Sequence, residues 1–184
     1  MTAMNTPALI IIDMQKGMAA PKAGRRNNPQ AEDQMAALLA GWRERGQPIV
    51  HVRHISRSPT SAFWPGQVGA EHQPRFAPQA NEHVMEKNVT DAFCNSGLER
   101  WLHVRGIRDL VIVGVSTNNS VEATARSAGN LGFATRVVAD ACFTFDGKDL
   151  SGALLEAEAI HQMSLANLNG EYATIVNTTD LLSH

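Results

Sequence analysis

The chain has 184 residues, of which 43% are apolar and 18% are charged, a composition typical of a single folded domain. Sixteen Lys and Arg residues against eighteen Asp and Glu residues give a formal charge of −2, which provides no basic surface for a nucleic-acid partner. The apolar run at residues 8–12 is far shorter than the roughly 20 residues needed to cross a bilayer, and no basic segment precedes it. We therefore expect one domain over residues 1–184, with no membrane span and no export signal, located in the cytoplasm. In that reducing compartment Cys94 and Cys142 would be free thiols.

Short apolar runs alternate with helical patterns along the chain. In chain order, after a polar arm at residues 1–6, we predict strand 8–12, helix 30–45, strands 48–53 and 84–87, helix 98–104, strand 109–115, helix 117–131, strand 134–139, helix 151–168 and strand 172–176. The central strands are continuous apolar runs, as expected where helices cover both faces of a mainly parallel sheet. The pattern therefore predicts an α/β domain.

One long segment, residues 54–82, shows no clear periodicity and is rich in Pro and Gly. A loop of this length inside one domain is usually functional, often as a lid. Its aromatic residues Phe63, Trp64 and Phe76 argue against disorder, which is poor in such residues. We expect Phe63 and Trp64 to be exposed on this lid, where a neighbouring subunit could cover them.

Polar residues follow several predicted strands. Asp13, Lys87, the turn at 116–120 and Asp140 each stand at or just after a strand end. In open α/β sheets, ligands bind outside the carboxyl ends of the strands. An acid, a base and a hydroxyl at one rim form a set suited to hydrolysis. Taken singly, each residue is better explained as a turn cap, a solvated strand end or a small helix residue.

Three segments in order and spacing resemble the motifs of the isochorismatase-like, or cysteine hydrolase, superfamily. They are residues 9–15 (LIIIDMQ), Lys87 with Phe93 six residues later, and residues 114–126 (GVSTNNSVEATAR). The resemblance runs from Pro7 to Val176 and implies a three-layer αβα sandwich around a six-stranded, mostly parallel sheet. It also implies a hydrolase of a small-molecule amide or related C–N bond, with no cofactor and with a homodimeric or larger assembly.

The resemblance implies roles for four residues. Asp13 matches the general base, and Lys87 matches the lysine that stabilises developing charge. Ser120 stands where most family members have a nucleophilic cysteine. The peptide bond before Ser116 is often cis in the family, which aims the N–H groups of Ser116 and Ser120 at an oxyanion. A nucleophile at a helix N-terminus is well placed for such chemistry, because the free N–H groups favour a developing anion.

Four more residues, His54, Trp64, Phe93 and Asn119, are candidates for contact with the substrate. For the aromatic residues, packing is the commoner role, and a plain surface histidine is as common as a binding one. Nicotinamidase-type family members bind zinc here through an aspartate and histidines. Residues 51–54 (HVRH) lack that aspartate, so we expect no metal.

The serine at position 120 leaves several alternatives open. It is a nucleophile activated by Asp13, or it replaces a cysteine in an inactivated enzyme. Alternatively, the protein acts as isochorismatases proper do, with Asp13 protonating a vinyl ether while water attacks and no covalent intermediate forms. The rival to all of these is a binding protein that has lost its nucleophile. The presence of both Asp13 and Lys87 favours an enzyme.

Overall fold

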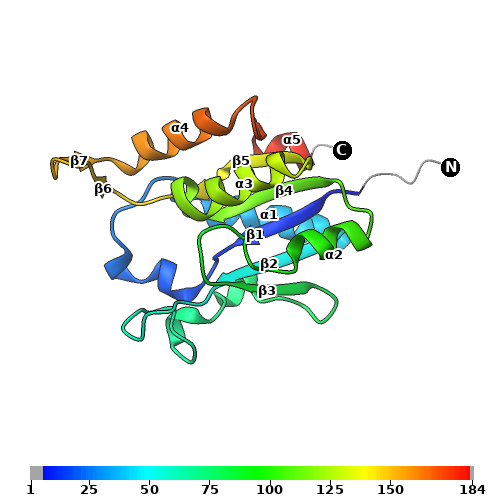
Figure 1. Ribbon diagram of the computed structural model, residues 1–184, viewed down its shortest axis with the longest axis horizontal. Helices are drawn as coiled ribbons and strands as arrows, with labels where there is room; N and C mark the ends of the chain where they lie inside the picture. The colour runs from blue at the N-terminus through cyan, green and yellow to red at the C-terminus, as the bar shows by residue number, and fades with distance from the viewer. Residues whose placement is uncertain (1–5, 183–184) are drawn as a thin grey trace.

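A single parallel sheet forms the centre of the computed structural model, which describes residues 6–182. The sheet contains β1 (Ala8–Ile12), β2 (Ile49–His54), β3 (His83–Lys87), β4 (Asp109–Val115), β5 (Ala134–Phe143) and β8 (Thr174–Val176). The strand order is β3-β2-β1-β4-β5-β8, and every neighbouring pair is parallel (Figure 1). The predicted α/β fold with six strands is therefore confirmed. The predicted polar arm lies outside the described residues except for Thr6.

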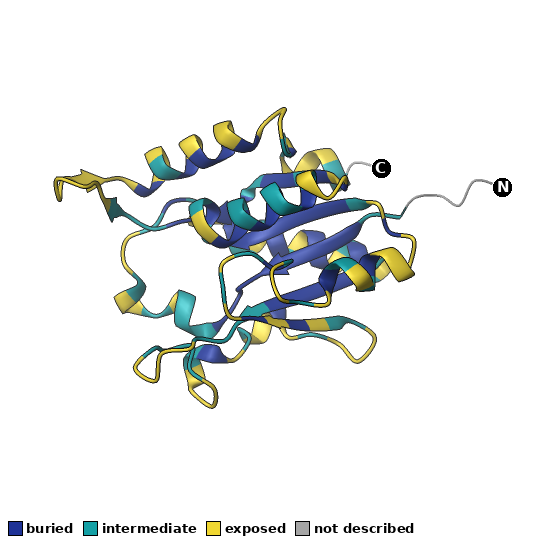
Figure 2. Cartoon of the chain, in the orientation of Figure 1, coloured by how far each residue is buried: buried dark blue, intermediate teal, exposed yellow. Residues whose placement is uncertain are grey.

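Helices cover both faces of the sheet. On one face lie α1 (Ala31–Glu44) and α5 (Thr178–Leu182), and on the other lie α2 (Leu98–Val104), α3 (Glu122–Asn130) and α4 (Ala157–Leu168) (Figure 1). Leu9 and Ile11 of β1 join the core beneath α1, whereas Ile10 and Ile12 join the core on the opposite face. Every residue of β1 is buried, which explains its unbroken apolar sequence (Figure 2).

The sheet has a switch point between β1 and β4. The chain adds β2 and β3 on one side of β1 and then crosses back to place β4 on the other side. Such a reversal opens a crevice at the carboxyl ends of the two central strands. Close to this point Gly114 has φ of 126°, and a Cβ there would lie 2.2 Å from the carbonyl oxygen of Ile12. Only glycine therefore lets β4 approach β1 so closely.

The predicted helix over residues 151–168 is wrong in its first six residues. Two short strands, β6 (Gly147–Lys148) and β7 (Leu154–Leu155), pair in an antiparallel arm, and α4 begins only at Ala157. The N–H of Ala157 donates to Oδ1 of Asp146 at 2.8 Å, which satisfies one of the free donors at the start of the helix.

Other features also differ from the predictions. The first turn of the predicted helix 117–131 is π-helical over Thr117–Val121, and the predicted strand 134–139 continues to Phe143. The short helix α5 was not predicted. Asp140, expected to offer its carboxylate at the rim, instead accepts hydrogen bonds at Oδ1 from the N–H and the hydroxyl of Thr178 at the start of α5. Its side chain thus caps a helix.

The long segment 54–82 is ordered by helical turns at Val68–Ala70 and Pro74–Phe76, and Phe76 is fully buried. Phe63 and Trp64 are half-buried rather than exposed. The ring of Phe63 packs edge-on against His54, with ring centroids 6.1 Å apart. The oligomeric state stays a prediction. Light scattering that returned a single 19.9 kDa species would contradict it.

Both cysteines are free, as predicted, with Cys94 exposed and Cys142 buried. Burial raises the pKa of the Cys142 thiol to about 12, so this thiol stays protonated and unreactive. Within residues 6–182, none of the helices has the length and apolar character needed to cross a membrane.

Candidate active site

The chain turns sharply at Asp13, directly after β1. Asp13 has φ of 54°, a left-handed conformation that Asp adopts more readily than most residues. Its N–H still donates to the carbonyl oxygen of Val52 at 2.8 Å, so the turn remains fastened to β2. The residue is only 1% exposed. The turn therefore leaves a carboxylate buried at the carboxyl end of the central strand.

Lys87, the last residue of β3, reaches this carboxylate from the edge of the sheet. Its Nζ donates to Oδ2 of Asp13 at 2.7 Å and to Oγ of Ser120 at 3.1 Å. Because β2 lies between β3 and β1, the side chain must extend past the end of β2, where His54 is its register partner. The lysine side chain is fully buried along this path.

Ser120 reaches the same point from β4. It lies in the π-helical turn Thr117–Val121, which leads into α3 and in which the N–H of Val121 donates to the carbonyl oxygen of Ser116 at 3.2 Å. The Val115–Ser116 peptide bond is cis, the isomer that the family resemblance implied. Ser120 is 7% exposed. The structure thus brings Asp13, Lys87 and Ser120, which come from three different strand ends, into one hydrogen-bonded cluster.

The carboxyl group of Asp13 has an unusual pKa and incomplete hydrogen bonding. Burial raises the pKa of the Asp13 carboxyl above its ordinary value, and the Lys87 ammonium ion and the Ser120 hydroxyl offset only part of this rise. Oδ2 is bonded to Lys87, whereas Oδ1 is buried and has no hydrogen-bond partner among the described residues. Buried polar atoms are normally satisfied. An oxygen of this kind is ready to accept a proton.

His54 lies beside the cluster at the end of β2. Burial lowers the pKa of its imidazole, and the nearby Lys87 ammonium ion lowers it further, while Asp13 acts in the opposite direction. The imidazole is therefore neutral near pH 7. A neutral ring next to Asp13 and Lys87 can form hydrogen bonds, and the candidate role of His54 in substrate contact stays a prediction.

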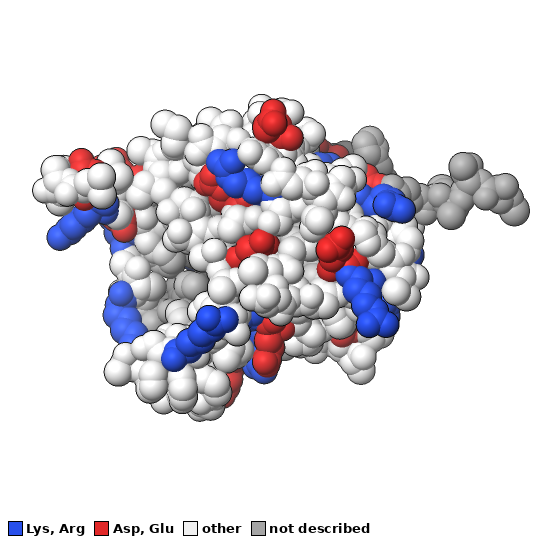
Figure 3. Space-filling model, viewed as in Figure 1, with Lys and Arg blue, Asp and Glu red and all other residues white. Residues whose placement is uncertain are grey.

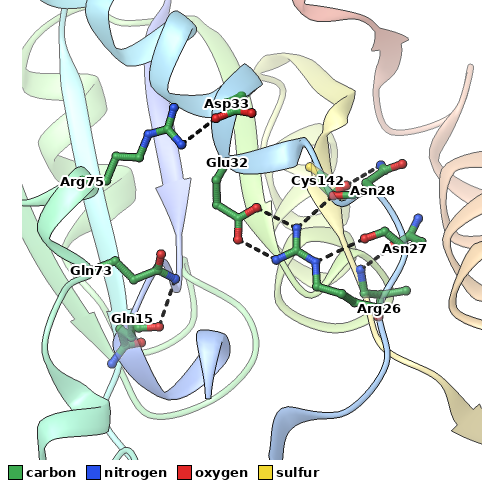
Figure 4. Close-up of polar contacts among 10 residues, drawn as sticks. Gln15, Arg26, Asn27, Asn28, Glu32, Asp33, Gln73, Arg75 and Cys142 are labelled. Carbon is green, nitrogen blue, oxygen red and sulfur yellow. Dashed lines mark hydrogen bonds and ion pairs between the residues drawn. The ribbon is translucent and has the colours of Figure 1, made fainter. Parts of the chain in front are cut away.

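Gln15 is a residue that the sequence analysis did not single out. It is fully buried, and its Nε2 donates to the carbonyl oxygens of His54 and Ala70, each at 2.9 Å. Its Oε1 accepts the N–H of His54 at 2.7 Å, and its own carbonyl oxygen accepts Nε2 of Gln73 at 3.3 Å (Figure 4). Gln15 therefore ties the end of β1 to the start of segment 54–82 and to its middle. The sequence signal that could have identified Gln15 as a residue of this region is its position two residues after Asp13.

The remaining predicted site residues lie in different surroundings. Asn119 is exposed, and its Nδ2 donates to Oγ of Ser116 at 3.3 Å. Trp64 is half-buried in segment 54–82. Phe93 does not join the cluster: its ring packs against the core and against Phe133, with centroids 5.7 Å apart. Phe133 precedes β5, at the opposite end of the sheet from the rim, so the structure places Phe93 as a packing residue.

His51, in the middle of β2, is engaged with other groups. Nε2 of His51 lies 2.8 Å from Oε2 of Glu82, and the His51 ring lies edge-on to His72 with centroids 5.8 Å apart. In the part of the chain that the structure describes, no group of three or more His, Cys, Asp or Glu side chains is arranged to hold a metal ion.

The molecule is hollowed at the side where the parallel strands end. Figure 3 shows this hollow on the left, between the arm that carries β6 and β7 and the segments that follow β1 and β2, with Lys and Arg side chains along its border. A separate cavity of about 340 Å³ touches Lys87 and is lined by Ile55, Ser56, Arg57, Glu86, Asn88 and Asn95. A small molecule can therefore approach this end of the sheet.

Comparison with known proteins identifies, over nearly the whole chain, the family that the sequence motifs resemble. Residues 7–180 match the model of the isochorismatase domain. A solved structure of an isochorismatase-family protein from Chromobacterium violaceum superposes with a TM-score of 0.95 at 46% identity, covering 100% of this chain and 94% of that one. The uncharacterized isochorismatase family protein YrdC of Bacillus subtilis is 37% identical over 96% of this chain and 94% of its own length. The maleamate amidohydrolase of Pseudomonas putida is 28% identical over 96% of this chain and 85% of its own length.

Proposed function

Because this chain belongs to the isochorismatase family and is a hydrolase, we propose that it cleaves a small-molecule amide or a related C–N bond at the Asp13–Lys87–Ser120 cluster. The observation that carries the proposal is the pair of hydrogen bonds from Lys87, which links a buried carboxylate to a hydroxyl on the turn before α3. The relative named as a maleamate amidohydrolase supports an amide as the substrate class.

The proposed reaction begins with Ser120. Its Oγ attacks the carbonyl carbon of the substrate while Asp13 accepts the hydroxyl proton, and the carbonyl electron pair moves to the oxygen. The C–N bond then breaks, and the leaving nitrogen takes the proton from Asp13. Water, activated by the same carboxylate, hydrolyses the acyl ester and restores Ser120.

Asp13 and Lys87 have complementary parts in this proposal. The raised pKa makes Asp13 a stronger base than an exposed aspartate, and the ion pair with Lys87 offsets part of the effect of burial. Lys87 already donates to Oγ, so its ammonium ion stabilises the negative charge that develops there as the proton leaves. The N–H groups of Ser116 and Ser120 are the proposed donors to the substrate oxyanion.

A second reaction is supported by one specific observation. A carboxyl with a raised pKa can also hold a proton and donate it, as vinyl ether hydrolysis of the isochorismatase type requires. In that reaction Asp13 protonates the substrate, water attacks, and Ser120 is a spectator. A binding protein without activity is disfavoured, because a buried ion pair is expensive to maintain without a use for it.

A substrate screen of small amides and isochorismate tests the proposal. We expect amide turnover by the wild type, its loss in Ser120→Ala and faster turnover in Ser120→Cys, because a thiol is partly ionised at neutral pH. Ser151→Ala, an exposed serine on the β6–β7 arm, is the matched control and should behave as wild type. Full amide turnover in Ser120→Ala would rule out the serine nucleophile. Isochorismate cleavage that survives Ser120→Ala but not Asp13→Ala would establish the second reaction instead.

A further inference from the structure

Two buried polar side chains on α4 have no part in the chemistry proposed above. His161 and Ser164 are each 2% exposed and share the inner face of the helix with apolar residues. A polar side chain in such a place destabilises the fold unless it is hydrogen-bonded. The partners of these two side chains therefore indicate what their placement achieves.

Both side chains bind Thr117, the first residue of the π-helical turn. Nδ1 of His161 lies 2.8 Å from Oγ1 of Thr117, and Oγ of Ser164 lies 3.0 Å from the Thr117 carbonyl oxygen. Oγ of Ser164 also lies 2.6 Å from Oε2 of Glu122, the first residue of α3. Thr117 itself is fully buried. The side chain and the main chain of one residue are thus both held from α4.

The opposite side of the imidazole faces the side chain of Asn28. Nε2 of His161 lies 3.5 Å from Nδ2 of Asn28. The Asn28 amide donates to the carbonyl oxygens of Ala139 and Cys142, at 3.0 Å and 2.7 Å, and Figure 4 shows this side chain directed at Cys142. His161 therefore lies between the turn that carries Ser120 and an amide fixed to β5.

We propose that His161 and Ser164 are positioning residues, which hold Thr117 so that the neighbouring Ser116 N–H and the Ser120 hydroxyl keep their orientation toward the substrate. This inference rests on the proposed role of Ser120 and adds two residues that act through the main chain. A π-helical turn is less regular than an α-helix and needs support from its surroundings. Displacement of a reacting group by about 1 Å can lower a rate by about a hundredfold.

The variants that test this inference remove the hydrogen bond between Thr117 and His161 while keeping the volume or the polarity of the side chain. Thr117→Val removes only the hydroxyl at nearly constant volume. His161→Gln retains a polar atom near the Nε2 position but removes the one at the Nδ1 position. His161→Asn retains a polar atom at the Nδ1 position. Each variant is first checked by circular dichroism. Thr117→Val carries the test alone if His161→Gln does not fold.

The first readout needs no hydrolysable substrate. Ser120→Cys introduces a thiol next to Lys87, and the pH dependence of its alkylation by iodoacetamide gives the pKa of that thiol. The ammonium ion 3.1 Å from the replaced oxygen should hold this pKa below the ordinary cysteine value. Adding Thr117→Val or His161→Gln should move the pKa back toward the ordinary value, while adding His161→Asn should leave it unchanged.

The second readout is turnover with Ser120 in place. Thr117→Val and His161→Gln should each lower kcat about tenfold or more with little change in KM, and the double variant should be no slower than the slower single variant. An unchanged thiol pKa in the folded Thr117→Val and His161→Gln variants would overturn the inference. Absent amide turnover together with the expected thiol shifts would overturn only the proposed function.

Discussion

Two buried carboxylates in this molecule, Asp13 and Glu82, stand in ion pairs of similar chemistry but differ in how completely they are satisfied. Glu82 receives hydrogen bonds from Arg43 at 2.6 Å, from the Gln79 N–H at 2.8 Å and from His51 at 2.8 Å, so both of its oxygens are engaged. Asp13 receives one from Lys87, and its Oδ1 has no partner among the described residues.

As a result, the pKa values of the two carboxyl groups are shifted in opposite directions. Burial works against ionisation at both sites. At Glu82 the hydrogen bonds from Arg43, Gln79 and His51 outweigh it, and the pKa falls to about 2. At Asp13 burial prevails over Lys87, and the pKa rises. A completely satisfied carboxylate contributes to the structure, whereas one that is buried but incompletely satisfied is available for proton transfer.

Asp13→Asn should have the largest effect on this comparison. It removes the only proposed base while keeping the shape of the side chain, so we expect kcat to fall by about a thousandfold. Steady-state kinetics at saturating substrate gives this number. Asp33→Asn, which alters an exposed carboxylate paired with Arg75, is the matched control and should stay within about twofold of wild type. Retention of activity in Asp13→Asn would remove the distinction between the two sites.

Glu82→Gln should show the opposite pattern. It weakens the contacts to Arg43 and His51, which lie outside the proposed site, so we expect the free energy of unfolding to fall by about 2 kcal/mol with kcat nearly unchanged. Urea denaturation measures the first quantity. Glu86→Gln breaks the exposed pair with Arg53 and should lower stability by less than about 0.5 kcal/mol. Equal losses in the two variants would show that burial adds nothing to the Glu82 network.

The pH dependence of activity and of stability should also distinguish Asp13 from Glu82, with a smaller effect than the two substitutions have. As pH falls through the raised pKa of Asp13 the base becomes protonated, so the acidic limb of kcat/KM should lie above 3.8, the ordinary value. Glu82 has a pKa below its ordinary 4.5, so its contribution is complete above pH 4.5 and is lost as pH falls toward about 2. The stability difference between wild type and Glu82→Gln should therefore not decline between pH 7 and 5, since Glu82 also favours the charged form of His51. If that difference already declined between pH 7 and 5, the assignment would be wrong.

The strands and the three residues of the proposed site were within reach of sequence analysis because local signals encode them. Continuous apolar runs mark strands buried on both faces, and Asp13, Lys87 and Ser120 each stand at or after a strand end. The family motifs then related the three residues to one another, which periodicity alone could not do.

The parts that sequence analysis missed depend on contacts between distant residues. The start of α4 is set by Asp146, eleven residues before Ala157, and the position of α5 depends on Asp140 of β5. Phe93 shared the motif segment with Lys87, yet its ring found Phe133 in the core. The function of Gln15 appears only when segment 54–82 folds back over the end of β1. None of these partners is near in sequence.

The central claim, that Ser120 forms a covalent ester during amide hydrolysis, is tested most directly by mass spectrometry of the quenched enzyme. Turnover of an amide substrate stopped with acid within the first catalytic cycles should leave the acyl mass on the tryptic peptide 109–126, at Ser120. Asp13→Asn should accumulate none, because the attack itself is blocked. Steady product formation with no acyl mass on that peptide, or with the mass on another residue, would contradict the claim.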